Sequence, residues 1–424
     1  MTKHYDIAIV GAGIAGASLA YFLSQHGAGS IVLLEAEDTP GYHTTGRSAA
    51  FWEPTYGGAG VVPLSAASRA FFDAPPPGFA ANPLLGPRGA LHISAPGEDG
   101  ALAALAVDFD GFGVETRVVD AAAMAARYPI VGGGWEREGL LEPDCHDIDV
   151  AALHAGFLSG AKRAGAVLVC SARVERVERL PAGNADDPHE GLPSPSGEGP
   201  GVGESLRVLG SERPHPRAGA SAPSLAPPLK GRGSEEVWHL ATTAGDFAAT
   251  TLVDAAGAWG DELATLAGVA PLGLTPLRRT MVVLDVDPAP PADLPVVFDA
   301  AGSFYFKPDG GRLWLSPHDE IADVARDAAP EELDIAVAID RFERATTARV
   351  RRVERSWAGL RTFSPDRNPV YGFDDAVPGF FWCVGQGGFG IQTAPAAGDL
   401  AARALLGRAA GPVDPAAYRP GRLR

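Results

Sequence analysis

Two short apolar runs near the start of the chain flank a stretch with helical periodicity. The first run covers residues 7–10 and the second ends at Glu35, and each has the length and composition of a buried strand. Gly11, Gly13 and Gly16 stand at the junction between the first run and the helical stretch. The pattern therefore predicts a strand, a tight glycine-rich turn, a helix and a second strand in succession.

The rest of the chain alternates between helical and extended patterns. Helical spacing of apolar residues predicts helices at 64–73, 101–126 (two short helices), 148–164 and 331–350. Alternating or wholly apolar runs predict strands at 90–94, 167–180, 279–286, 303–307 and 312–315, the last two as a hairpin around residues 308–311. Residues 249–260 are predicted to form a buried strand that runs into a glycine turn. Residues 380–406 have the pattern of a strand, a glycine-rich turn and a helix, so a second helix N-terminus is expected to face a ligand.

Residues 181–235 differ in composition from the rest of the chain. They contain ten prolines, ten glycines and no aromatic residue. Such a segment buries too little apolar surface to offset the entropy lost on ordering, so we expect a disordered insertion. Its flanks, 172–180 and 237–243, have the pattern of two strands of one hairpin. The insertion is therefore predicted at a hairpin tip, where the cost of closing a loop rises only slowly with its length.

The glycine-rich turn has the spacing of a dinucleotide-binding site. Gly11 permits the tight turn, Gly13 lets backbone N–H groups approach a pyrophosphate, and Gly16 lets the helix pack closely on the sheet. The helix N-terminus then presents its positive end to the phosphates. Glu35 stands where an acid accepts a hydrogen bond from the 2′-OH of an adenosine ribose. The unit predicts a bound dinucleotide and by itself leaves FAD and NAD as alternatives.

Composition and charge narrow the class of protein. The 424 residues are enough for about two or three domains, and 46% hydrophobic residues allow a sizeable core. The net charge of −17 argues against nucleic acid or an anionic membrane surface as a main partner. Cys145, Cys170 and Cys383 form no CxxC pair, so neither a disulfide framework nor a metal site is predicted. No apolar run has the length of a membrane span and the first strand leaves no room for a signal peptide, so we expect a cytoplasmic protein.

Several segments together resemble the D-amino-acid oxidase superfamily of FAD enzymes. They are the N-terminal unit with Glu35, the loop GYHTTGRSAAF (41–51), DAAGAWGDELATLAG (254–268) and GQGGFGIQT (385–393). Within the superfamily, segments 64–73, 271–279, 303–309, 344–347 and 357–363 are similar in order and spacing to those of the bacterial D-arginine dehydrogenases. The resemblance favours FAD over NAD, because the superfamily places a second glycine-rich turn beside the isoalloxazine.

The resemblance and the interrupted nucleotide-binding pattern imply a fold of the α/β + α+β type. A Rossmann-like, glutathione-reductase-type FAD-binding domain with a parallel sheet is expected from residues 1–60, 140–180, 236–262 and 350–424. Residues 61–139 and 263–349 are expected to form a substrate-binding domain on a mixed, largely antiparallel sheet. The cofactor domain is thus expected to be discontinuous in sequence.

The resemblance also implies cofactor contacts along the whole chain. In the superfamily, the turn that Gly387, Gly388 and Gly390 match stabilises negative charge on the reduced flavin, and Val174 matches a residue whose backbone meets the adenine. No cysteine matches a position of covalent attachment, so noncovalent FAD is expected. The expected cofactor-binding residues are Gly11, Gly13, Ile14, Ala15, Gly16, Glu35, Ala36, Thr44, Thr45, Gly46, Arg47, Ser48, Ala49, Ala50, Val174, Gly257, Trp259, Gly359, Gly387, Gly388, Gly390, Ile391, Gln392 and Thr393.

Oxidation of an amine at its α-carbon requires a clamped carboxylate and a neutral amine. A guanidinium binds both carboxylate oxygens and stays charged, and Arg279 and Arg361 are candidates for this catalytic clamp. Arg279 fits a surface salt bridge equally well, whereas Arg361 lies in an apolar context and should have an anionic partner. The phenols of Tyr56 and Tyr305 have the pattern of core aromatics, and by resemblance they contact the carboxylate or cover the pocket. No general base is evident, and hydride transfer from a neutral amine needs no strong one.

The chain departs from the D-arginine dehydrogenases at three pocket positions. By resemblance, Ala90 replaces an acid that meets the substrate guanidinium, Gly302 replaces a second acid and Phe51 replaces a histidine. Deleting one partner of a buried carboxylate–guanidinium pair costs about 3–5 kcal/mol, so D-arginine and D-lysine should be poor substrates. Glu53 keeps one acid nearby and leaves a basic substrate open. The expected pocket residues are Phe51, Glu53, Ala90, Val296, Phe298, Gly302 and Gly388.

The resemblance thus implies an FAD-dependent D-amino-acid dehydrogenase that prefers neutral or hydrophobic substrates. Hydride transfer from the α-carbon to flavin N5 would give an imino acid, which hydrolyses to a 2-oxo acid and ammonia. The electron acceptor stays open among a quinone, an electron-transfer protein and oxygen. Two alternatives remain: a sarcosine-, glycine- or imino-acid-type oxidase that uses oxygen on the same scaffold, and an FAD-binding redox or assembly module without an amine substrate.

Overall fold

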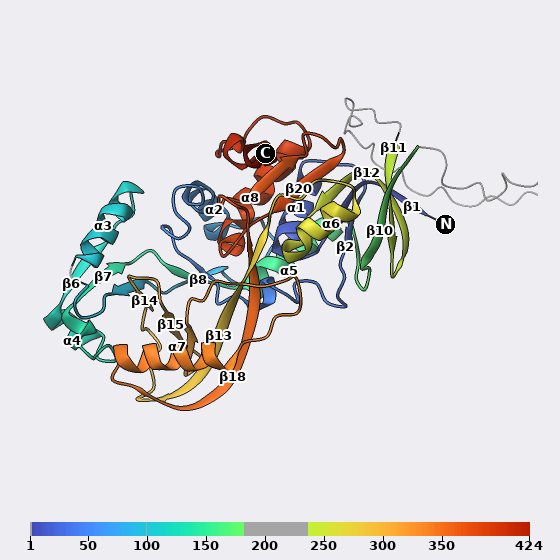
Figure 1. Ribbon diagram of the computed structural model, residues 1–424. Coiled ribbons are helices and arrows are strands. Elements are labelled where there is room, and N and C mark those ends of the chain that lie inside the picture. Colours follow the sequence, from blue (N-terminus) through green and yellow to red (C-terminus); the bar gives the residue numbers. More distant parts are fainter. Residues whose placement is uncertain (1, 99, 182–235) are drawn as a thin grey trace, which may run out of the picture.

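Two large sheets organise the chain in the computed structural model, which describes residues 2–98, 100–181 and 236–424 (Figure 1). One sheet has eight strands and a parallel centre, and the other has nine strands and is largely antiparallel. The combination of α/β and α+β parts predicted from sequence is confirmed. The predicted disordered insertion lies, except for Pro181, outside the described residues.

The eight-stranded sheet contains the glycine-rich unit. Its order is β10-β11-β12-β1-β2-β9, with β20 paired to β12 and β19 paired to β20. The pairs that join β20, β12, β1, β2 and β9 are all parallel, as expected for a nucleotide-binding sheet. The bounds are β1 (Lys3–Val10), β2 (Ile31–Leu34), β9 (Val167–Val169), β10 (Val174–Pro181), β11 (Glu236–Thr242), β12 (Gly245–Asp254), β19 (Val370–Phe373) and β20 (Phe380–Val384).

Alternation along β1 divides the interior of this part into two cores. Ile7 and Ile9 face helices on one side, whereas Ala8 faces the β10–β11 hairpin on the other. The helices on the first side are α1 (Ile14–Gln25), α2 (Val62–Asp73), α5 (Val150–Arg163) and α8 (Gly390–Leu405). On the second side lies α6 (Gly260–Leu266), where Leu263 shares a buried cluster with Trp238. Both faces of the parallel strands are therefore buried, which explains their continuous apolar runs.

The nine-stranded sheet has the order β17-β13-β16-β15-β14-β5-β7-β6, and β18 also pairs with β13. Helix α7 packs on it through Ala338 and Phe342. The strands are β5 (Ala90–Ile93), β6 (Arg117–Asp120), β7 (Glu138–Glu142), β13 (Thr275–Asp287), β14 (Val296–Asp299), β15 (Tyr305–Asp309), β16 (Arg312–Ser316), β17 (Ile321–Ala322) and β18 (Arg349–Phe363). The helices of this part are α3 (Ala101–Gly111), α4 (Ala121–Arg127) and α7 (Glu332–Ala345).

Short elements complete the structure. A three-stranded sheet consists of β3 (Phe51–Trp52), β8 (His146–Ile148) and β4 (Leu85–Pro87). The 3₁₀ helices are Thr45–Arg47, Trp135–Arg137, Gly257–Trp259, Pro415–Tyr418 and Pro420–Leu423. Within the described ranges, no helix combines the length and apolar character needed to cross a membrane.

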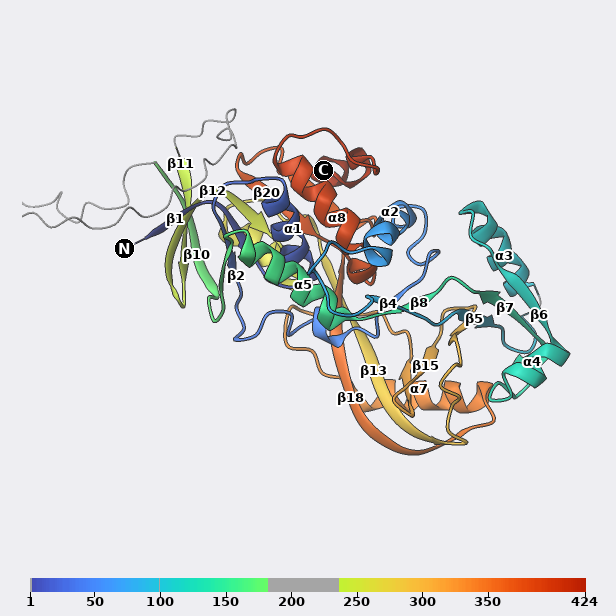
Figure 2. The same cartoon turned by 180° about the vertical axis from the view of Figure 1, so that it is seen from behind.

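The paired strands β13 and β18 connect the two parts of the molecule. They run from the helices α1 and α8 to α7 at the far end (Figures 1 and 2). Their register pairs Leu277 with Arg361 and Arg279 with Gly359. Because residues two apart on a strand share a face, the register puts Arg279 and Arg361 diagonally on the same face of this ribbon.

Three predicted elements differ from the structure. The helix predicted at 331–350 ends at Ala345, because Thr346 is extended and bridges Val131. The strand predicted at 167–180 is two strands: Ser171 adopts a positive φ of 53° and the next amide donates to the Glu35 carbonyl at 2.8 Å. The turn predicted at 308–311 contains only Gly310 and Gly311 outside the strands. The β10–β11 hairpin predicted around the insertion is confirmed.

The predicted domain boundaries do not coincide with the two sheets. Residues 350–363 were expected in the cofactor domain, but β18 pairs with β13 along its whole length. The part of β7 beyond residue 139 also belongs to the nine-stranded sheet. Conversely, α2 was expected in the substrate domain, but Leu64 and Phe72 lie in the core shared by α1 and α8. Apolar periodicity identifies such segments as buried without identifying the core that buries them.

Candidate active site

A large groove lies at the carboxyl ends of the central parallel strands. Its lining includes the ends of three neighbouring strands: Val10 of β1, Leu34 of β2 and Ala255, which follows β12. The groove encloses about 1560 Å³, part of it open to solvent. Ligands of parallel α/β sheets bind at this edge, so the groove is the expected place for a dinucleotide.

The three glycines of the N-terminal turn have the separate roles that their spacing predicted. Gly11 has φ +102°, and a Cβ there would lie 2.4 Å from the Ala255 carbonyl oxygen. A Cβ on Gly16 would lie 2.0 Å from the carbonyl oxygen of Gly11, so only glycine lets α1 pack this closely. Gly13 caps α1 and lines the groove. The N-terminus of α1 therefore faces the groove, where the Thr45 hydroxyl accepts a hydrogen bond from the Ile14 amide at 3.0 Å.

Glu35 lines the groove directly after β2, and its carboxylate is held by backbone donors. The amide of Ala12 donates to Oε2 at 2.9 Å, and the amide of Glu37 donates to Oε1 at 3.1 Å. These bonds join the glycine-rich turn to the end of β2 and fix the orientation of the carboxylate. Each carboxylate oxygen still has a second lone pair with which to accept a hydroxyl proton.

Most of the expected cofactor-binding residues line this groove, although they come from distant parts of the chain. They are Gly11, Gly13, Ile14, Ala15, Glu35, Ala36, Thr44, Thr45, Arg47, Ser48, Val174, Gly257, Trp259, Gly359, Gly387, Gly388, Gly390 and Ile391. Ala49, Ala50 and Gln392 line a second, adjoining cavity instead.

Gly16, Gly46 and Thr393 line neither cavity. Gly46 packs against the Gly41 carbonyl, 2.8 Å from where its Cβ would lie, and the buried Thr393 hydroxyl donates to the Phe389 carbonyl at 2.9 Å. Gly16 lets α1 pack on the sheet, the role that its spacing predicted, whereas Gly46 and Thr393 support the loop and the helix beside the groove without lining it.

The groove also contains side chains that the sequence did not identify. His43 packs on Trp259 with ring centroids 4.7 Å apart and bonds Glu37 at 3.0 Å. Thr362, next to Arg361, lines the groove with an Oγ1 that has no hydrogen-bond partner among the described residues. These residues border recognised motifs but have no pattern of their own, so only their position in the groove identifies them.

A smaller cavity adjoins the groove and shares part of its wall. Ser48, Arg361, Gly388 and Ile391 line both. The other side chains of this cavity are mainly aromatic and come from the three-stranded sheet, the nine-stranded sheet and two loops: Phe51, Tyr56, Phe298, Tyr305 and His318. Its space amounts to about 400 Å³, part of it open to solvent. The structure thus brings Tyr56, Tyr305 and Arg361 together at one small, mostly apolar space.

Arg361 stands at the junction of the groove and the small cavity. Its Nη1 donates to the Tyr56 hydroxyl at 3.2 Å. The anionic partner expected for it is absent from the described residues, where no carboxylate forms an ion pair with this guanidinium. A Cβ on Gly388 would lie 2.6 Å from the Tyr56 hydroxyl and 2.8 Å from Arg361 Nη1. Glycine at 388 therefore leaves room for the pair, and the guanidinium keeps an uncompensated charge beside the cavity.

Arg279 forms a salt bridge and also faces the groove, so it fits both of the roles considered for it from the sequence. It is buried, its Nε donates to the Asp319 carbonyl at 2.7 Å, and its Nη2 donates to Glu320 at 3.1 Å. Arg279 also lines the groove, and its Nη1 has no hydrogen-bond partner in the described part of the chain. Burial, and then the positive charge of Arg361, lower the pKa of the guanidinium. Arg279 therefore forms a salt bridge and still has a donor for an anion.

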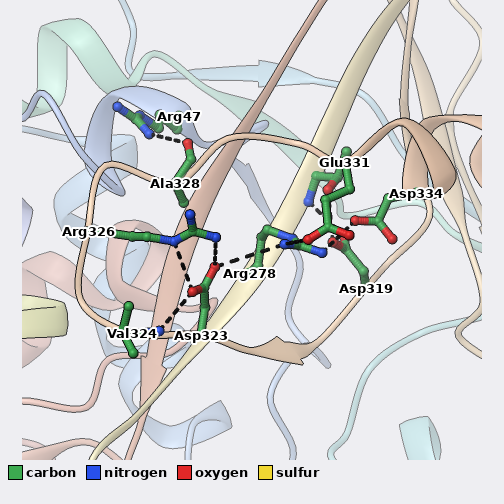
Figure 3. A network of polar contacts seen from close by, with 10 residues as sticks. Arg47, Arg278, Asp319, Asp323, Val324, Arg326, Ala328, Glu331 and Asp334 are labelled. Carbon is green, nitrogen blue, oxygen red and sulfur yellow. Dashed lines mark hydrogen bonds and ion pairs between the residues drawn. The ribbon is translucent and has the colours of Figure 1, made fainter.

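The segment that follows β16 is anchored on both sides of the site. Arg278 of β13 bonds Glu331 and, at 2.8 Å, Asp334, and Figure 3 shows these contacts. In the same network, Arg326 pairs with Asp323 at 2.7 Å. Arg47 of the loop beside the groove donates to the Ala328 carbonyl at 3.0 Å (Figure 3). The loop that contains Asp319 and Glu320 is thus tied to both β13 and the groove.

His318 begins that anchored loop and lines the small cavity. It adopts a positive φ of 55°, and its Nδ1 lies 2.7 Å from the Gly302 carbonyl oxygen. Because a carbonyl only accepts, Nδ1 carries the proton and Nε2 of the neutral ring is an acceptor. Burial, and then the charge of Arg279, lower the pKa of His318 to about 3. No motif pointed to this histidine; its place beside Tyr305, with ring centroids 5.7 Å apart, singles it out.

Four of the expected pocket residues lie outside the lining of the small cavity. Ala90 and Val296 are paired on β5 and β14 and are fully buried in a cluster with Tyr305. Gly302 forms a turn with φ +74°, and its carbonyl bonds His318. Glu53 is 4% exposed, and burial, then the Glu142 carboxylate, raise its pKa well above the usual range. None of the four lines the cavity as expected: Ala90, Val296 and Glu53 are buried behind it, whereas Gly302 is in an exposed turn.

The comparison with protein families agrees with this architecture. A family model described as "FAD dependent oxidoreductase" (DAO) matches residues 6–191 and 228–404. The chain belongs to the DAO family of FAD-dependent oxidoreductases. Its cofactor is therefore FAD.

Curated relatives of this DAO-family protein are distant. The chain is 25% identical over 177 residues to FAD-dependent oxidoreductase domain-containing protein 1 of Xenopus laevis. The aligned region covers 37% of the chain and 34% of that protein. It is 28% identical over 172 residues to hydrogen cyanide synthase subunit HcnC of Pseudomonas protegens, with 40% of each covered. The matches thus span about a third to two fifths of the length of the relatives.

Solved structures share the fold over the whole chain. Glycine oxidase from Geobacillus kaustophilus superposes with a TM-score of 0.74 at 20% identity and covers 99% of this chain and 98% of its own. L-proline dehydrogenase from P. horikoshii superposes with a TM-score of 0.73 at 17% identity, with 100% and 98% covered. At these identities the likeness shows a common DAO-type fold.

The geometry of the groove fits FAD. The glycine-rich turn and the N-terminus of α1 line the groove together with the Thr45 hydroxyl, and a helix N-terminus suits a pyrophosphate. Thr362 Oγ1 and Arg279 Nη1 are buried polar groups without protein partners, and both residues line the groove. None of the three cysteines, all of which lie in the described ranges, lines either cavity.

Proposed function

We propose that this DAO-family enzyme oxidises D-amino acids at the α-carbon and prefers neutral or hydrophobic side chains. The single observation that supports it most is the guanidinium of Arg361, which has no anionic partner and lies between the cofactor groove and a small aromatic cavity. Bound FAD supplies the acceptor for the hydride that leaves the α-carbon. The imino acid then hydrolyses to a 2-oxo acid and ammonia.

In this proposal two ends of the chain hold the cofactor. Gly13, Ile14 and Ala15 at the start of α1 bind the pyrophosphate, and Glu35 accepts a ribose hydroxyl. The turn before α8 and its first residues would contact the isoalloxazine, with the backbone N–H groups of Gly388, Gly390 and Ile391 as donors, because the Gly387 amide already bonds the Thr362 carbonyl. The binding is noncovalent, consistent with the distance of all cysteines from the lining.

The substrate carboxylate binds to the arginine pair. Arg361 supplies the main donor fork, and the free Nη1 of Arg279 faces the same groove from the neighbouring strand. The hydroxyl of Tyr56, already bonded to Arg361, and the phenol of Tyr305 complete the polar end of the cavity. A carboxylate there replaces the missing anionic partner of Arg361, which makes the two buried charges mutually compensating.

The substrate amine faces His318. Its Nε2 is an acceptor, and the imidazole is neutral because its pKa lies near 3 in the free site. The positive charges of Arg279 and Arg361 help to lower that pKa, so a bound carboxylate that offsets them raises it again. The ring thereby becomes a better proton acceptor when the substrate is in place, and the amine is held in its neutral, oxidisable form.

The side chain of the substrate lies against the aromatic wall. Phe51 and Phe298 contact each other edge to face, with centroids 5.4 Å apart, and both line the cavity. No acidic side chain lines this cavity among the described residues, so the guanidinium of D-arginine would stay unpaired. The preference for the D configuration rests on the motif resemblance to the D-arginine dehydrogenases.

A second function, oxidation of glycine or sarcosine by oxygen, is favoured by one observation. The cavity is small, and Phe51, Phe298 and Tyr305 close its far end with ring centroids 5.4–5.8 Å apart. A substrate with little or no side chain fits this space without movement of the rings. The shared fold of glycine oxidase supports the scaffold for this reaction, and the low identity leaves the substrate undecided.

Anaerobic reduction of the bound flavin tests the proposal. The FAD-loaded protein is mixed with D-leucine, D-phenylalanine, D-methionine and D-arginine, and with L-enantiomers, glycine and sarcosine as controls, and the visible flavin absorbance is followed. Fast bleaching by apolar D-amino acids with slow D-arginine supports the proposal. Bleaching by glycine or sarcosine alone supports the second function, and no bleaching by any amine contradicts both.

A separate measurement addresses the electron acceptor. Peroxide release under air indicates oxygen as the acceptor, whereas flavin that stays reduced under air but is reoxidised by a soluble quinone indicates a dehydrogenase. The outcome distinguishes the dehydrogenase and oxidase forms of the proposal for any substrate that reduces the flavin.

A further inference from the structure

Three titratable side chains from separate segments converge behind the aromatic wall of the cavity. Glu53 follows β3, His92 lies on β5 and Glu142 ends β7. They are 4%, 5% and 0% exposed, and one ligand atom from each lies within 4.8 Å of the others. His92 Nε2 is 3.9 Å from a Glu53 oxygen and 3.8 Å from a Glu142 oxygen. We call these three residues the buried triad.

The buried triad has more polar atoms than the protein satisfies. Glu53 Oε2, Glu142 Oε1 and His92 Nε2 have no hydrogen-bond partner within the described ranges. The only side-chain bond to a triad carboxylate in these ranges comes from Thr55, whose hydroxyl donates to Glu142 at 3.0 Å. Such orphaned groups are expensive in a protein interior, so a ligand bound to the triad is expected.

Protein cations near the buried triad are already engaged. Lys307 bonds Asp147 at 2.8 Å, and Arg88 pairs with the same carboxylate at 2.6 Å. Neither forms an ion pair with Glu53 or Glu142 in the described part of the chain. The two buried carboxylates therefore have only the neighbouring imidazole as a potential counter-charge, and its Nε2 is beyond hydrogen-bond distance of both.

We propose that the buried triad binds one divalent transition-metal ion, of which Zn²⁺ and Mn²⁺ are the test cases. Two carboxylates and an imidazole are a donor set that suits both ions. Metal–ligand distances of about 2.0–2.2 Å put the ligand atoms of one site roughly 3 to 4.5 Å apart, which the spacing of the triad nearly matches. A metal ion bound to His92 Nε2 and to both carboxylates, each of which has an oxygen within 3.9 Å of that nitrogen, would give the imidazole a partner and offset the two buried negative charges.

The position of the triad favours an ion over a cationic group of the substrate. None of its members lines the cavity, and His92 is stacked under the Phe298 ring with centroids 5.3 Å apart and planes 16° apart. An ammonium or guanidinium could reach the triad only if that ring moved. A monatomic ion is small enough to bind without movement of the Phe298 ring. It would link the segments of β3, β5 and β7 directly under the wall of the cavity.

Metal analysis of the FAD-loaded protein tests this proposal without reference to activity. The protein is dialysed against EDTA, reloaded with Zn²⁺ or Mn²⁺, desalted and analysed for metal content and melting temperature. We expect about one ion per chain and a melting temperature raised by a few degrees. Glu142→Gln and His92→Gln should each lose the ion and the thermal shift.

His239→Gln is the matched control for His92→Gln. His239 on β11 also has an Nε2 without a partner in the described residues, but it has no nearby carboxylate pair. The control should keep the ion. Absence of metal from the wild-type protein, or equal metal retention in the triad variants, which means adventitious metal only, would overturn the proposal.

A spectroscopic measurement on the wild-type protein covers the case in which the triad variants do not fold. X-ray absorption of the metal-loaded protein should show oxygen and nitrogen ligands with the signature of a single imidazole. A sulfur ligand, or no imidazole, would place the ion elsewhere and contradict the assignment. Because none of these readouts uses turnover, failure here leaves the proposed amine oxidation intact, and failure of that proposal leaves the metal site intact.

Discussion

Arg361 on β18 donates a hydrogen bond to the hydroxyl of Tyr56, 305 positions earlier in the chain, over 3.2 Å. One residue comes from the long ribbon of the nine-stranded sheet and the other follows β3 of the small sheet. Gly388 leaves the space that the pair needs. The bond thus joins three parts of the chain at the junction between the cofactor groove and the cavity.

Replacement of Arg361 by methionine should abolish most substrate binding and leave FAD in place. Loss of the only unpaired guanidinium of the cavity lining removes a buried charge pair with the substrate carboxylate, worth about 3–5 kcal/mol. We expect kcat/KM to fall by roughly 150- to 4,000-fold. Stopped-flow flavin reduction measures the loss, and the flavin-to-protein absorbance ratio checks cofactor content.

Arg367→Met is the control for Arg361→Met. Arg367 lies close by in sequence, is paired with Glu320 at 2.9 Å and lines neither cavity. In the Arg367→Met variant, the substrate should reduce the flavin at nearly the wild-type rate. Equal losses in both variants would mean that Arg361 has no special role in binding.

Gly388→Ala should disturb the clamp specifically. The new Cβ would lie 2.6 Å from the Tyr56 hydroxyl and 2.8 Å from Arg361 Nη1, so both side chains must shift. We expect the KM for the substrate to rise at least tenfold, which corresponds to about 1.4 kcal/mol. Gly86→Ala, where a Cβ meets nothing within 4 Å, is the matched control. A KM unchanged by Gly388→Ala would show that the pair does not bind the carboxylate.

Gly11→Ala should produce a protein that retains little FAD. Alanine at this position is strained by the φ of +102°, and its Cβ would clash with the Ala255 carbonyl oxygen at 2.4 Å. The end of β12 would have to move away from β1 at the mouth of the groove. Flavin content after purification measures the effect, and a variant with full flavin content would refute this account of the turn.

His318 should make the unfolding free energy fall in mild acid. Its folded-state pKa of about 3 lies below the ordinary value of 6.5, so between these values the unfolded chain binds a proton that the folded protein does not. The contribution of His318 to the unfolding free energy is constant well above pH 6.5. It becomes destabilising as the pH drops from there toward 3. Between these two pKa values, the unfolding free energy changes with pH by up to about 1.4 kcal/mol per pH unit.

His318→Gln removes this pH dependence. Between pH 7 and pH 5 the variant should lose about 2 kcal/mol less unfolding free energy than the wild type. Urea unfolding of both proteins at the two pH values measures the difference. Parallel losses in the two proteins would show that His318 is not held neutral by the fold.

Local sequence patterns were enough for the cofactor half of the site. The glycine spacing and Glu35 predicted the groove, because a tight turn and a close helix–sheet contact depend on residues only a few positions apart. The second glycine-rich turn was found in the same way. Errors arose where a residue supports the groove from behind, as Thr393 does, since motif membership does not reveal on which side a side chain lies.

Tertiary structure alone decided the substrate half. Ala90 and Val296 have the apolar character of pocket residues, but the pairing of β5 with β14 buries them under Tyr305. The pKa of His318 is lowered by burial and by two arginines on other strands, and the bond from Nδ1 to the Gly302 carbonyl leaves Nε2 as the acceptor. No periodicity or motif spacing in the sequence predicts either of these contacts.

The sequence by itself determined the fold class, the family and the cofactor, because these depend on contacts between residues close in the chain and on repeated apolar periodicity. It also identified Arg361 and the two tyrosines, although not the absence of a protein anion beside the guanidinium. Only the tertiary structure decided which charges stay unpaired, since Glu53, His92 and Glu142 meet through strands that pair across large sequence separations. Burial and charge compensation are properties of the whole packed interior, and the chemistry of this site follows from them.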